Sequence, residues 1–379
     1  MLQRPLPRNR WPALLLLSAG LAAATPVQTR ETADDIEALI ARLGLEESAV
    51  AARDWPGWRT PERIVVTLDT PDRLEWLQQA APGVELVAVA DEAAAAAAAA
   101  EGADAVIGYC SDAIVAGNDR LRWIQVFSAG VERCVSIPAL REREVLLTNM
   151  QRVSGPVMAE HVFALLLGLT RDLTTWIDGQ RAGEWRPPED EPDRMAALRD
   201  KTLLVAGLGG IGAEVARLGH AFGMNVIATR ASGRKGPEYV SYIGLPDELV
   251  ELAKRADVVV NTVPLTPQTR GIFDARFFAA MKPGGYFINV GRGASANTAA
   301  LLAALESGRL AGAGLDVTDP EPLPADHPLR QRGNVIITPH VSARTDAGRE
   351  DRWLVARENL RRYVQGEPLL SVVDVRRGY

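Results

Sequence analysis

The chain has 379 residues, of which 47% are hydrophobic and 24% charged, and its formal net charge is −6. This balance is typical of a globular protein, and a chain of this length is expected to form two domains. The small excess of acidic residues gives no general attraction to nucleic acids or anionic lipids. Two cysteines are too few for a disulfide scaffold or a four-cysteine zinc site, and no His or Cys residues fall at metal-binding spacing.

Residues 1–24 have the pattern of an export signal. Three arginines in the first ten residues form a basic start, an apolar run follows, and the alanines at 22–24 offer a cleavage site. About 14 apolar residues are too few to span the roughly 30 Å core of a bilayer, so we expect no stable membrane insertion after cleavage. We therefore predict a signal peptide over residues 1–24 and an exported, periplasmic protein. A mis-assigned start codon would instead make the protein cytoplasmic.

The first half of the chain alternates between helical and strand patterns. Apolar residues at positions 36, 39, 40 and 43 predict a helix over residues 29–44. Helical patterns then separate short apolar runs, and this alternation is typical of a parallel sheet. The runs predict strands at residues 63–68, 85–90, 105–109, 124–127 and 145–148.

The second half begins with a long apolar helical pattern over residues 157–181, followed by a stretch rich in proline and acidic residues at 187–192. Alternation then restarts and ends with a helix over residues 346–365. The sequence thus predicts an α/β fold class with two Rossmann-like, doubly wound parallel-sheet domains, one nested inside the other. The strands predicted in this half lie at 202–206, 225–229, 257–262, 285–289, 312–316 and 334–338.

A glycine-rich motif follows the strand predicted at residues 202–206 and opens a helix. The first glycine permits a tight turn, the second lets backbone amides approach a pyrophosphate, and the third lets the helix pack close to the strand. The helix N-terminus favours the negative charge. In this context the motif predicts dinucleotide binding rather than an ordinary turn. Its residues are Gly207, Gly209, Gly210, Ile211 and Gly212.

The end of the next strand indicates which dinucleotide is bound. An NAD site usually has an acidic side chain there, which binds the ribose hydroxyls. This chain instead has Thr229 and Arg230, with Arg234 and Lys235 close behind. No carboxylate would repel a 2′-phosphate, and a guanidinium can bind one through two hydrogen bonds. We therefore favour NADP as the cofactor, with NAD as the alternative if Arg230 stacks on the adenine.

Three polar motifs each follow a predicted strand, so they should meet at the carboxyl edge of one sheet. They contain Arg292 between two glycines, Asp316 with Glu321, and His340. An arginine can bind the carboxylate of a 2-keto acid, a histidine can give a proton to the forming alkoxide, and a carboxylate can hold the imidazole in one tautomer. His161 lies outside such a motif, and we expect it to be a helix-packing residue.

These motifs, in this order and with these gaps, resemble the D-isomer-specific 2-hydroxyacid dehydrogenases over about residues 105–373. The resemblance implies Arg292 as the substrate-binding arginine, Glu321 as the orienting acid and His340 as the acid/base. It also implies that the backbone amides of Ala129 and Gly130 bind the substrate carboxylate. Besides the glycine motif, Thr229 and Arg230, the positions implied to contact the cofactor are Val263, Pro264, Val290, Gly291, Asp316 and His340.

The resemblance also implies that the chain crosses between domains near residues 153 and 343. Residues 25–153 and 344–379 would form the substrate domain, and residues 154–343 the NAD(P)-binding domain. The helix that begins near Ala159-Glu160-His161 looks like the family's dimer helix, so we expect a homodimer.

We expect an NAD(P)-dependent enzyme that interconverts small 2-keto acids and D-2-hydroxy acids, with glyoxylate or hydroxypyruvate as substrates by resemblance. Formate oxidation is disfavoured, because similar formate enzymes have an amide in place of Glu321. Phosphite oxidation stays open, but no residue in the sequence points to it. The alternatives are a dinucleotide-binding protein without activity and a catalytically retired exported protein. Intact Arg292, Glu321 and His340 argue against a retired enzyme.

Overall fold

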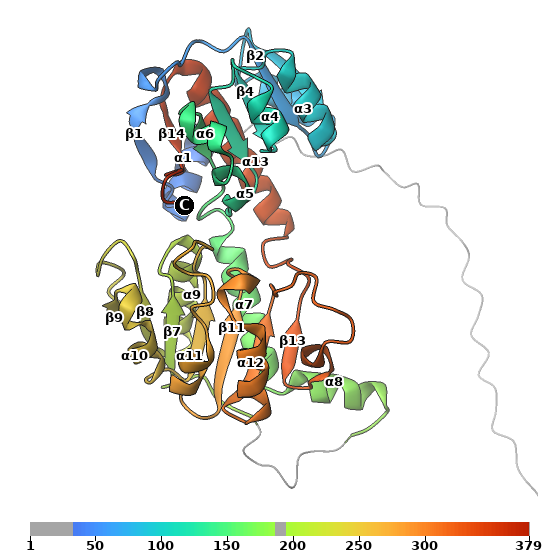
Figure 1. The fold of residues 1–379 in the computed structure, drawn as a ribbon, viewed down its shortest axis with the longest axis vertical. Coiled ribbons are helices and arrows are strands. Elements are labelled where there is room, and N and C mark those ends of the chain that lie inside the picture. Colours follow the sequence, from blue (N-terminus) through green and yellow to red (C-terminus); the bar gives the residue numbers. More distant parts are fainter. Residues whose placement is uncertain (1–32, 186–194, 379) are drawn as a thin grey trace, which may run out of the picture.

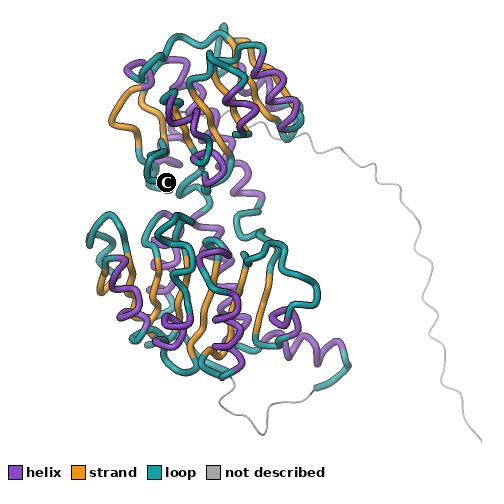
Figure 2. The backbone as a smooth tube through the Cα atoms, in the orientation of Figure 1, coloured by secondary structure: helices purple, strands orange, loops and turns teal. Residues whose placement is uncertain are grey.

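The computed structural model describes residues 33–185 and 195–378, so the signal peptide predicted over residues 1–24 lies outside the described residues. The chain forms two domains, each built on a parallel β-sheet (Figures 1 and 2). We call them the five-stranded and the seven-stranded domain. The five-stranded domain contains the described chain up to β6 (Leu146–Thr148) together with the last helix, α13 (Asp346–Gln365).

Five parallel strands in the order β3-β2-β4-β5-β6 form the first sheet, close to the positions predicted from sequence. Ile64, Val65 and Val66 are fully buried, because separate apolar clusters cover the two faces of the sheet. The other strands are β2 (Arg63–Thr67), β3 (Glu85–Val89), β4 (Ala105–Gly108) and β5 (Trp123–Val126), and the helices are α2 (Arg73–Gln78), α3 (Glu92–Ala100), α4 (Asp112–Ala116), α5 (Glu132–Val135) and α6 (Pro138–Glu142).

The C-terminal segment returns to complete the five-stranded domain. Helix α13 packs beside α1 (Ala33–Leu43), and β14 (Pro368–Leu370) pairs antiparallel with β1 (Glu47–Ala51). Tyr363 of α13 is fully buried, with its ring centroid 4.7 Å from that of Trp123. The apolar face predicted for residues 346–365 thus belongs to the core of the first domain.

The seven-stranded sheet has the order β13-β12-β11-β10-β7-β8-β9. The strand order reverses between β7 and β10, which is the topology of a doubly wound sheet. The strands are β7 (Thr202–Ala206), β8 (Asn225–Thr229), β9 (Val240–Gly244), β10 (Val258–Asn261), β11 (Gly285–Asn289), β12 (Leu310–Leu315) and β13 (Val335–Ile337). The covering helices are α7 (Gly155–Thr170), α9 (Gly210–Ala221), α10 (Leu249–Ala253), α11 (Ala275–Ala280) and α12 (Thr298–Glu306), with short 3₁₀ turns at Pro246–Glu248, Gly293–Ser295 and Pro328–Gln331. A further 3₁₀ turn, at Ala52–Asp54, follows β1 in the five-stranded domain.

The single helix predicted over residues 157–181 is wrong, because the structure has two helices there. Helix α7 ends at Thr170, and α8 (Leu173–Arg181) begins after Asp172, whose φ of +52° breaks the helix. An aspartate tolerates this left-handed conformation better than most side chains. Helix α8 therefore projects away from the seven-stranded sheet (Figure 1).

Within residues 33–185 and 195–378, no helix is long and apolar enough to cross a membrane, and no group of His, Cys, Asp or Glu side chains is arranged to hold a metal ion. Cys110 and Cys134 are free thiols buried in one apolar cluster of the five-stranded domain.

Candidate active site

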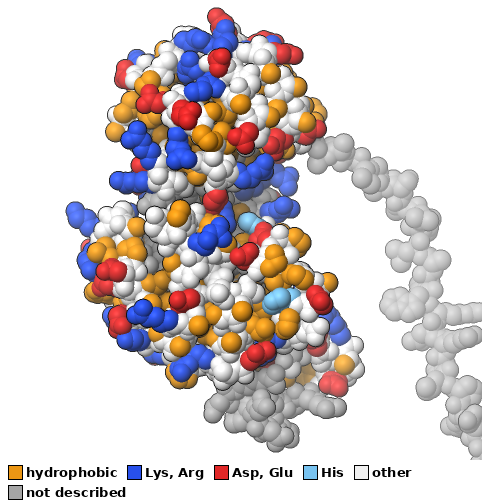
Figure 3. Space-filling model, viewed as in Figure 1, with side chains coloured by type: hydrophobic (Ala, Val, Ile, Leu, Met, Phe, Trp, Pro, Cys, Tyr) orange, Lys and Arg blue, Asp and Glu red, His pale blue; other side chains and the backbone are white. Residues whose placement is uncertain are grey.

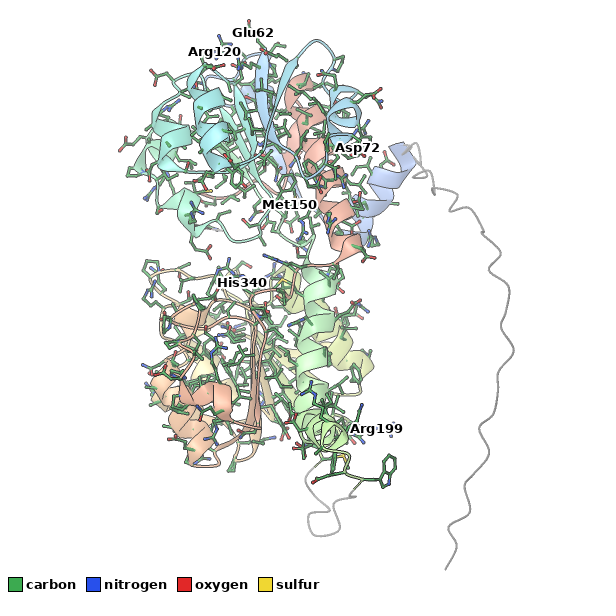
Figure 4. The ribbon with its side chains drawn as sticks, turned by 90° about the vertical axis from the view of Figure 1, so that its right-hand side faces the viewer. Glu62, Asp72, Arg120, Met150, Arg199 and His340 are labelled. Atoms are coloured by element: carbon green, nitrogen blue, oxygen red, sulfur yellow. The ribbon has the colours of Figure 1, made fainter. Side chains whose placement is uncertain are left out.

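Except for Ala129 and Gly130, the predicted site residues lie at the carboxyl ends of the strands of the seven-stranded sheet, on the edge that faces the other domain. Figure 4 shows His340 on this edge and Met150 on the facing edge of the five-stranded domain. Lys and Arg side chains gather around the narrow part of the molecule between the domains (Figure 3). In doubly wound sheets, ligands bind outside this edge near the point where the strand order reverses.

The glycine motif forms a tight turn between β7 and α9. Gly207 has a φ of +97°, and a Cβ there would lie 3.1 Å from the backbone of Thr262. A Cβ on Gly212 would lie 2.1 Å from the carbonyl oxygen of Gly207, so only glycine lets the helix pack this close. Gly209 faces open space beside the N-terminus of α9, which begins at Gly210. The turn therefore has room for a pyrophosphate at a helix N-terminus, and these residues fit a dinucleotide cofactor.

Thr229 and Arg230 follow at the end of β8. Thr229 is buried, and its hydroxyl accepts a hydrogen bond from the Gly207 amide at 3.3 Å, which ties the turn to the next strand. The Arg230 guanidinium donates to the carbonyl oxygen of Lys235 at 2.7 Å. Among the ion pairs of the described residues, none involves Arg230. Its charge is thus available to an anion at the end of β8.

Arg234, the second arginine of this segment, is already paired. Its guanidinium lies 2.6 Å from the carboxylate of Glu248 and donates to the Tyr242 hydroxyl at 3.1 Å. Hydrogen bonds from Tyr242, from the Leu245 amide and from Arg234 lower the pKa of Glu248 to about 2. Glu248 therefore stays ionised near neutral pH and keeps Arg234 engaged.

Buried amides fix the loops that follow β10 and β11. The Asn261 side chain donates to Asn289 at 2.8 Å and to Ser295 at 2.7 Å. Asn261 also accepts from the Val263 amide and Asn289 from the Gly291 amide, both at 3.1 Å. Sequence reasoning missed this network, although asparagines that end two neighbouring apolar strands were a usable signal. The network fixes the positions of two loops relative to each other, and both loops are implied to contact the cofactor.

The remaining positions implied to contact the cofactor differ in exposure. Val290 is buried, with 2% of its surface exposed, and its amide donates to the carbonyl oxygen of Asn261 at 3.3 Å. Ile211 is half-buried at the start of α9, and Pro264 is exposed on the loop after β10. All three lie on the same sheet edge as the glycine turn.

Arg292 follows β11 and reaches towards the five-stranded domain. A Cβ on Gly293 would lie 1.9 Å from the carbonyl oxygen of Thr318, so this glycine is needed for the loop to pass. The Arg292 Nη1 donates to the carbonyl oxygen of Gly291 at 2.8 Å. Its Nε lies 3.1 Å from Oε1 of Glu132, at the start of α5 in the other domain.

The loop after β5 approaches Arg292 from the five-stranded domain. The Ala129 carbonyl accepts from the Asn149 side chain and the Gly130 carbonyl from the Ser128 hydroxyl, both at 2.7 Å. A Cβ on Gly130 would lie 1.6 Å from Arg292 Nη2, so the lack of a side chain at this position lets the guanidinium pack against the loop. No hydrogen bond among the described residues uses the amides of Ala129 or Gly130, which leaves them free to bind an anion.

His340 and Glu321 are in direct contact. His340 Nδ1 lies 2.7 Å from Glu321 Oε1, and both side chains are roughly half exposed, at 49% and 42%. An ionised carboxylate only accepts hydrogen bonds, so the pairing places a proton on Nδ1. Nε2 is then the ring nitrogen that can exchange a proton with a ligand. The other Glu321 oxygen accepts from the Thr318 amide at 3.3 Å, which fixes the carboxylate.

Asp316, at the end of β12, holds the loop that carries His340. Its buried carboxylate accepts from the Thr338 hydroxyl at 2.7 Å and from the amides of Val341 and Ser342 at 2.9 and 3.0 Å. The His340 amide donates to the Asp316 carbonyl at 2.9 Å, and His340 has a φ of +53°. This left-handed backbone costs about 1–3 kcal/mol and persists because the surrounding bonds enforce it.

The same bonds set the charge of Asp316. Burial alone would raise the pKa of this carboxyl group, but the hydrogen bonds from Ser342, Thr338 and Val341 outweigh burial and lower its pKa. Asp316 was implied to contact the cofactor, and in the structure its carboxylate faces the His340 loop.

His161 of α7 contacts this loop as well. Its Nε2 lies 2.9 Å from the Thr338 hydroxyl and 3.7 Å from Oδ1 of Asp316. The sequence had indicated a helix-packing residue, and nothing local in the sequence links α7 to a loop 177 residues later.

Comparison with known proteins identifies the family of this chain. The family model "D-isomer specific 2-hydroxyacid dehydrogenase, NAD binding domain" matches residues 163–342. Glyoxylate/hydroxypyruvate reductase B of Escherichia fergusonii is 34% identical over 257 residues, which are 67% of this chain and 78% of that protein. D-3-phosphoglycerate dehydrogenase of Methanocaldococcus jannaschii is 32% identical over 262 residues, or 69% of this chain, and the match spans 49% of that longer protein.

A solved structure extends the likeness across both domains. The NADPH-dependent glyoxylate/hydroxypyruvate reductase from Sinorhizobium meliloti, in complex with NADP and sulfate, matches with a TM-score of 0.70 and 29% identity, covering 84% of this chain and 100% of that chain. The predicted α/β fold class and the family resemblance are confirmed, and a non-enzymatic or retired protein is not favoured. The chain belongs to the D-isomer specific 2-hydroxyacid dehydrogenase family and is an NAD(P)-dependent dehydrogenase.

Proposed function

We propose that this dehydrogenase reduces short 2-keto acids to D-2-hydroxy acids. The observation that carries the proposal is the 2.7 Å contact between His340 and Glu321, on the sheet edge that also holds Arg292 and the glycine turn. A nicotinamide dinucleotide bound along that turn would supply the hydride. The side chains then have to bind the carboxylate and deliver one proton.

Arg292 and the loop after β5 bind the substrate carboxylate in this proposal. The guanidinium and the unengaged amides of Ala129 and Gly130 lie on facing edges of the two domains. Together they offer charge-assisted hydrogen bonds to a carboxylate from both sides. A guanidinium beside the adjacent keto oxygen also stabilises the negative charge that develops there.

His340 gives its proton to the forming alkoxide in this proposal. Glu321 accepts from Nδ1, so in the protonated ring Nε2 carries the proton that is transferred. Glu321 also stabilises the imidazolium before transfer. In the oxidative direction the neutral ring takes the proton back at the same nitrogen.

NADP is the cofactor that we favour. Arg230 has no ion-pair partner among the described residues and lies at the end of β8, where an adenosine 2′-phosphate lies in dinucleotide sites of this topology. The related reductase from Sinorhizobium meliloti was solved with NADP. Glyoxylate and hydroxypyruvate are the substrates we place first, because the relatives of this chain carry those names.

We further propose that the enzyme is a homodimer. Helix α8 has no buried residue, and Leu173 and Ile177 are 46% and 44% exposed. A second copy that covers α7 and α8 would remove this apolar surface from water. Light scattering of the purified protein should give twice the mass of one chain, and the mass of a single chain would refute the dimer.

We also propose that residues 1–24 direct export and are removed. The basic start, the apolar run and the alanines at 22–24 support this. Expressed in a bacterium with its own start codon, the protein should appear in the periplasmic fraction with Thr25 as its first residue. A cytoplasmic protein that retains Met1 would favour the mis-assigned start instead.

The function is tested by following the oxidation of NADPH and of NADH separately with glyoxylate, hydroxypyruvate, pyruvate and phenylpyruvate. We expect turnover with NADPH, faster than with NADH, and glyoxylate or hydroxypyruvate as the best substrate. Equal rates with both cofactors would contradict the role of Arg230 and leave the reductase intact. Cofactor binding without turnover of any keto acid would contradict the proposed function.

A further inference from the structure

The guanidinium of Arg292 is already bound by a carboxylate of the protein itself. Glu132 Oε1 lies 3.1 Å from Arg292 Nε, and Oε2 lies 3.4 Å from Nη2, so the carboxylate faces the side edge of the guanidinium with both oxygens. Arg292 belongs to the seven-stranded domain and Glu132 to the five-stranded domain. This is the side-on geometry in which arginine binds carboxylates.

This pair is unusual in its position. Among the ion pairs of residues 33–185 and 195–378, it is the only one that joins the two domains. The remaining nitrogen, Nη1, donates to the carbonyl oxygen of Gly291 at 2.8 Å, within the same loop. All three guanidinium nitrogens therefore have a partner, and within the described part of the chain Glu132 supplies the only negative charge on them.

Glu132 and a keto acid present the same chemical group to Arg292. Glu132 lies two residues after Gly130, whose amide is proposed to hold the substrate carboxylate. A substrate carboxylate at that amide and the Glu132 carboxylate would therefore share one guanidinium. Two carboxylates at one guanidinium repel each other. Binding of the substrate carboxylate therefore weakens the ion pair between Glu132 and Arg292.

We propose that Glu132 is a specificity-determining residue that occupies Arg292 until a substrate carboxylate replaces it. The exchange keeps one negative charge on the guanidinium in both states, so the arginine is never left without a counter-ion. A ligand without a carboxylate cannot make the exchange and leaves the pair between the domains intact. This role rests on the proposed function, since it names the group that competes with the keto acid.

The size of the effect follows from the exposure of the pair. The side chains of Arg292 and Glu132 are 30% and 32% exposed, so the pair is partly screened by water. Competition from such a pair lowers the affinity for a carboxylate about two- to fivefold. Removing the charge of Glu132 should therefore strengthen carboxylate binding by that factor.

The test compares Glu132→Gln with Glu142→Gln, which removes the same charge from an exposed position on the nearby helix α6. We expect Glu132→Gln to lower the KM for glyoxylate about two- to fivefold, and to change kcat less than KM. Glu132→Asp, which keeps the charge, should restore most of the native KM. Glu142→Gln should behave as the native enzyme.

Binding of oxamate, a carboxylate that is not reduced, gives a second readout that does not need turnover. Calorimetry of the NADP-loaded protein should show the same decrease in Kd for Glu132→Gln. In an Arg292→Gln background, Glu132→Gln should have no further effect, because the competition acts through the guanidinium. If Glu132→Gln still lowered the Kd for oxamate without Arg292, Glu132 would act only by electrostatic repulsion of the ligand. That result would overturn the proposal.

Two other results would overturn it. A KM or Kd that rises in Glu132→Gln would mean that Glu132 positions Arg292 for binding, and an unchanged KM and Kd would mean that the pair is passive. Failure of the proposed function is distinguishable, because the native enzyme would then not turn over glyoxylate at all while oxamate binding still reports on the exchange.

Discussion

Asp316 is a single residue on which the geometry around His340 depends. Its carboxylate accepts three hydrogen bonds from the loop that carries the histidine. Asp316→Asn turns one acceptor oxygen into a donor, which leaves at least one loop amide without a partner. We expect the free energy of unfolding at pH 7 to fall by about 1–3 kcal/mol and kcat to fall with it. Urea denaturation and steady-state kinetics measure the two effects.

The pH dependence of this loss has a definite sign. The pKa of Asp316 is lower in the folded protein than its ordinary value of about 4. The ionised carboxylate therefore stabilises the fold above about pH 4, and this contribution is lost as the pH falls through the pKa of the folded state. The stability difference between the native chain and Asp316→Asn should therefore narrow on acidification below about pH 4. The control is Asp326→Asn at an exposed site, which should match the native chain throughout. A difference that does not vary with pH would contradict this role.

Arg230 carries the cofactor preference at the residue scale. Arg230→Gln removes the cation at the end of β8, so the KM for NADPH should rise about 10–100-fold. This factor corresponds to the free energy of the charge-assisted hydrogen bonds that an arginine makes to one phosphate. The KM for NADH should stay within about twofold, since NADH has no 2′-phosphate. Kinetics with both cofactors measure the difference.

Arg234→Gln is the matched control, because that guanidinium is held 2.6 Å from Glu248. It should change the KM for NADPH much less than Arg230→Gln does. Equal losses with NADPH and NADH in Arg230→Gln would show that Arg230 contacts a part common to both cofactors.

At the scale of elements, α13 closes the five-stranded domain, and Gly366 caps its C-terminal end. This glycine has a φ of +69°, and a Cβ there would lie 2.8 Å from Cβ of Arg53 and 3.1 Å from the ring of Trp58. Gly308, after α12, has a φ of +72° and open space. Alanine at either site costs about 1–2 kcal/mol for the left-handed backbone. Gly366→Ala should lower Tm more than Gly308→Ala, and equal shifts in calorimetry would rule out the contact with Arg53.

Most elements could be predicted because their side-chain periodicity matches their burial. Helix α13 and strands β7, β8 and β11 have the predicted bounds. The break before α8 could not be predicted, because Leu169, Leu173 and Ile177 keep helical spacing on both sides of Asp172. Strand β9 was missed because Ser241 and Tyr242 are exposed on a short edge strand, so no buried apolar run marks it.

At the scale of the whole molecule, the site is assembled from both domains. The order of the motifs predicted that His340 and Glu321 meet, because both follow strands of one parallel sheet. No such rule connects Glu132 to Arg292, which lie 160 residues apart and meet only through the relative placement of the domains. The same limit applies to His161, whose partner Thr338 is set by the packing of α7 on the sheet.

The most direct test of the mechanism compares His340→Ala with His327→Ala, a histidine that accepts a hydrogen bond from the Leu329 amide in a separate loop. Loss of the proton donor should lower kcat for glyoxylate about 10²–10⁴-fold. NADPH should still bind, as measured by fluorescence titration, and His327→Ala should remain active. Normal turnover by His340→Ala would contradict the assignment of His340 as the proton donor.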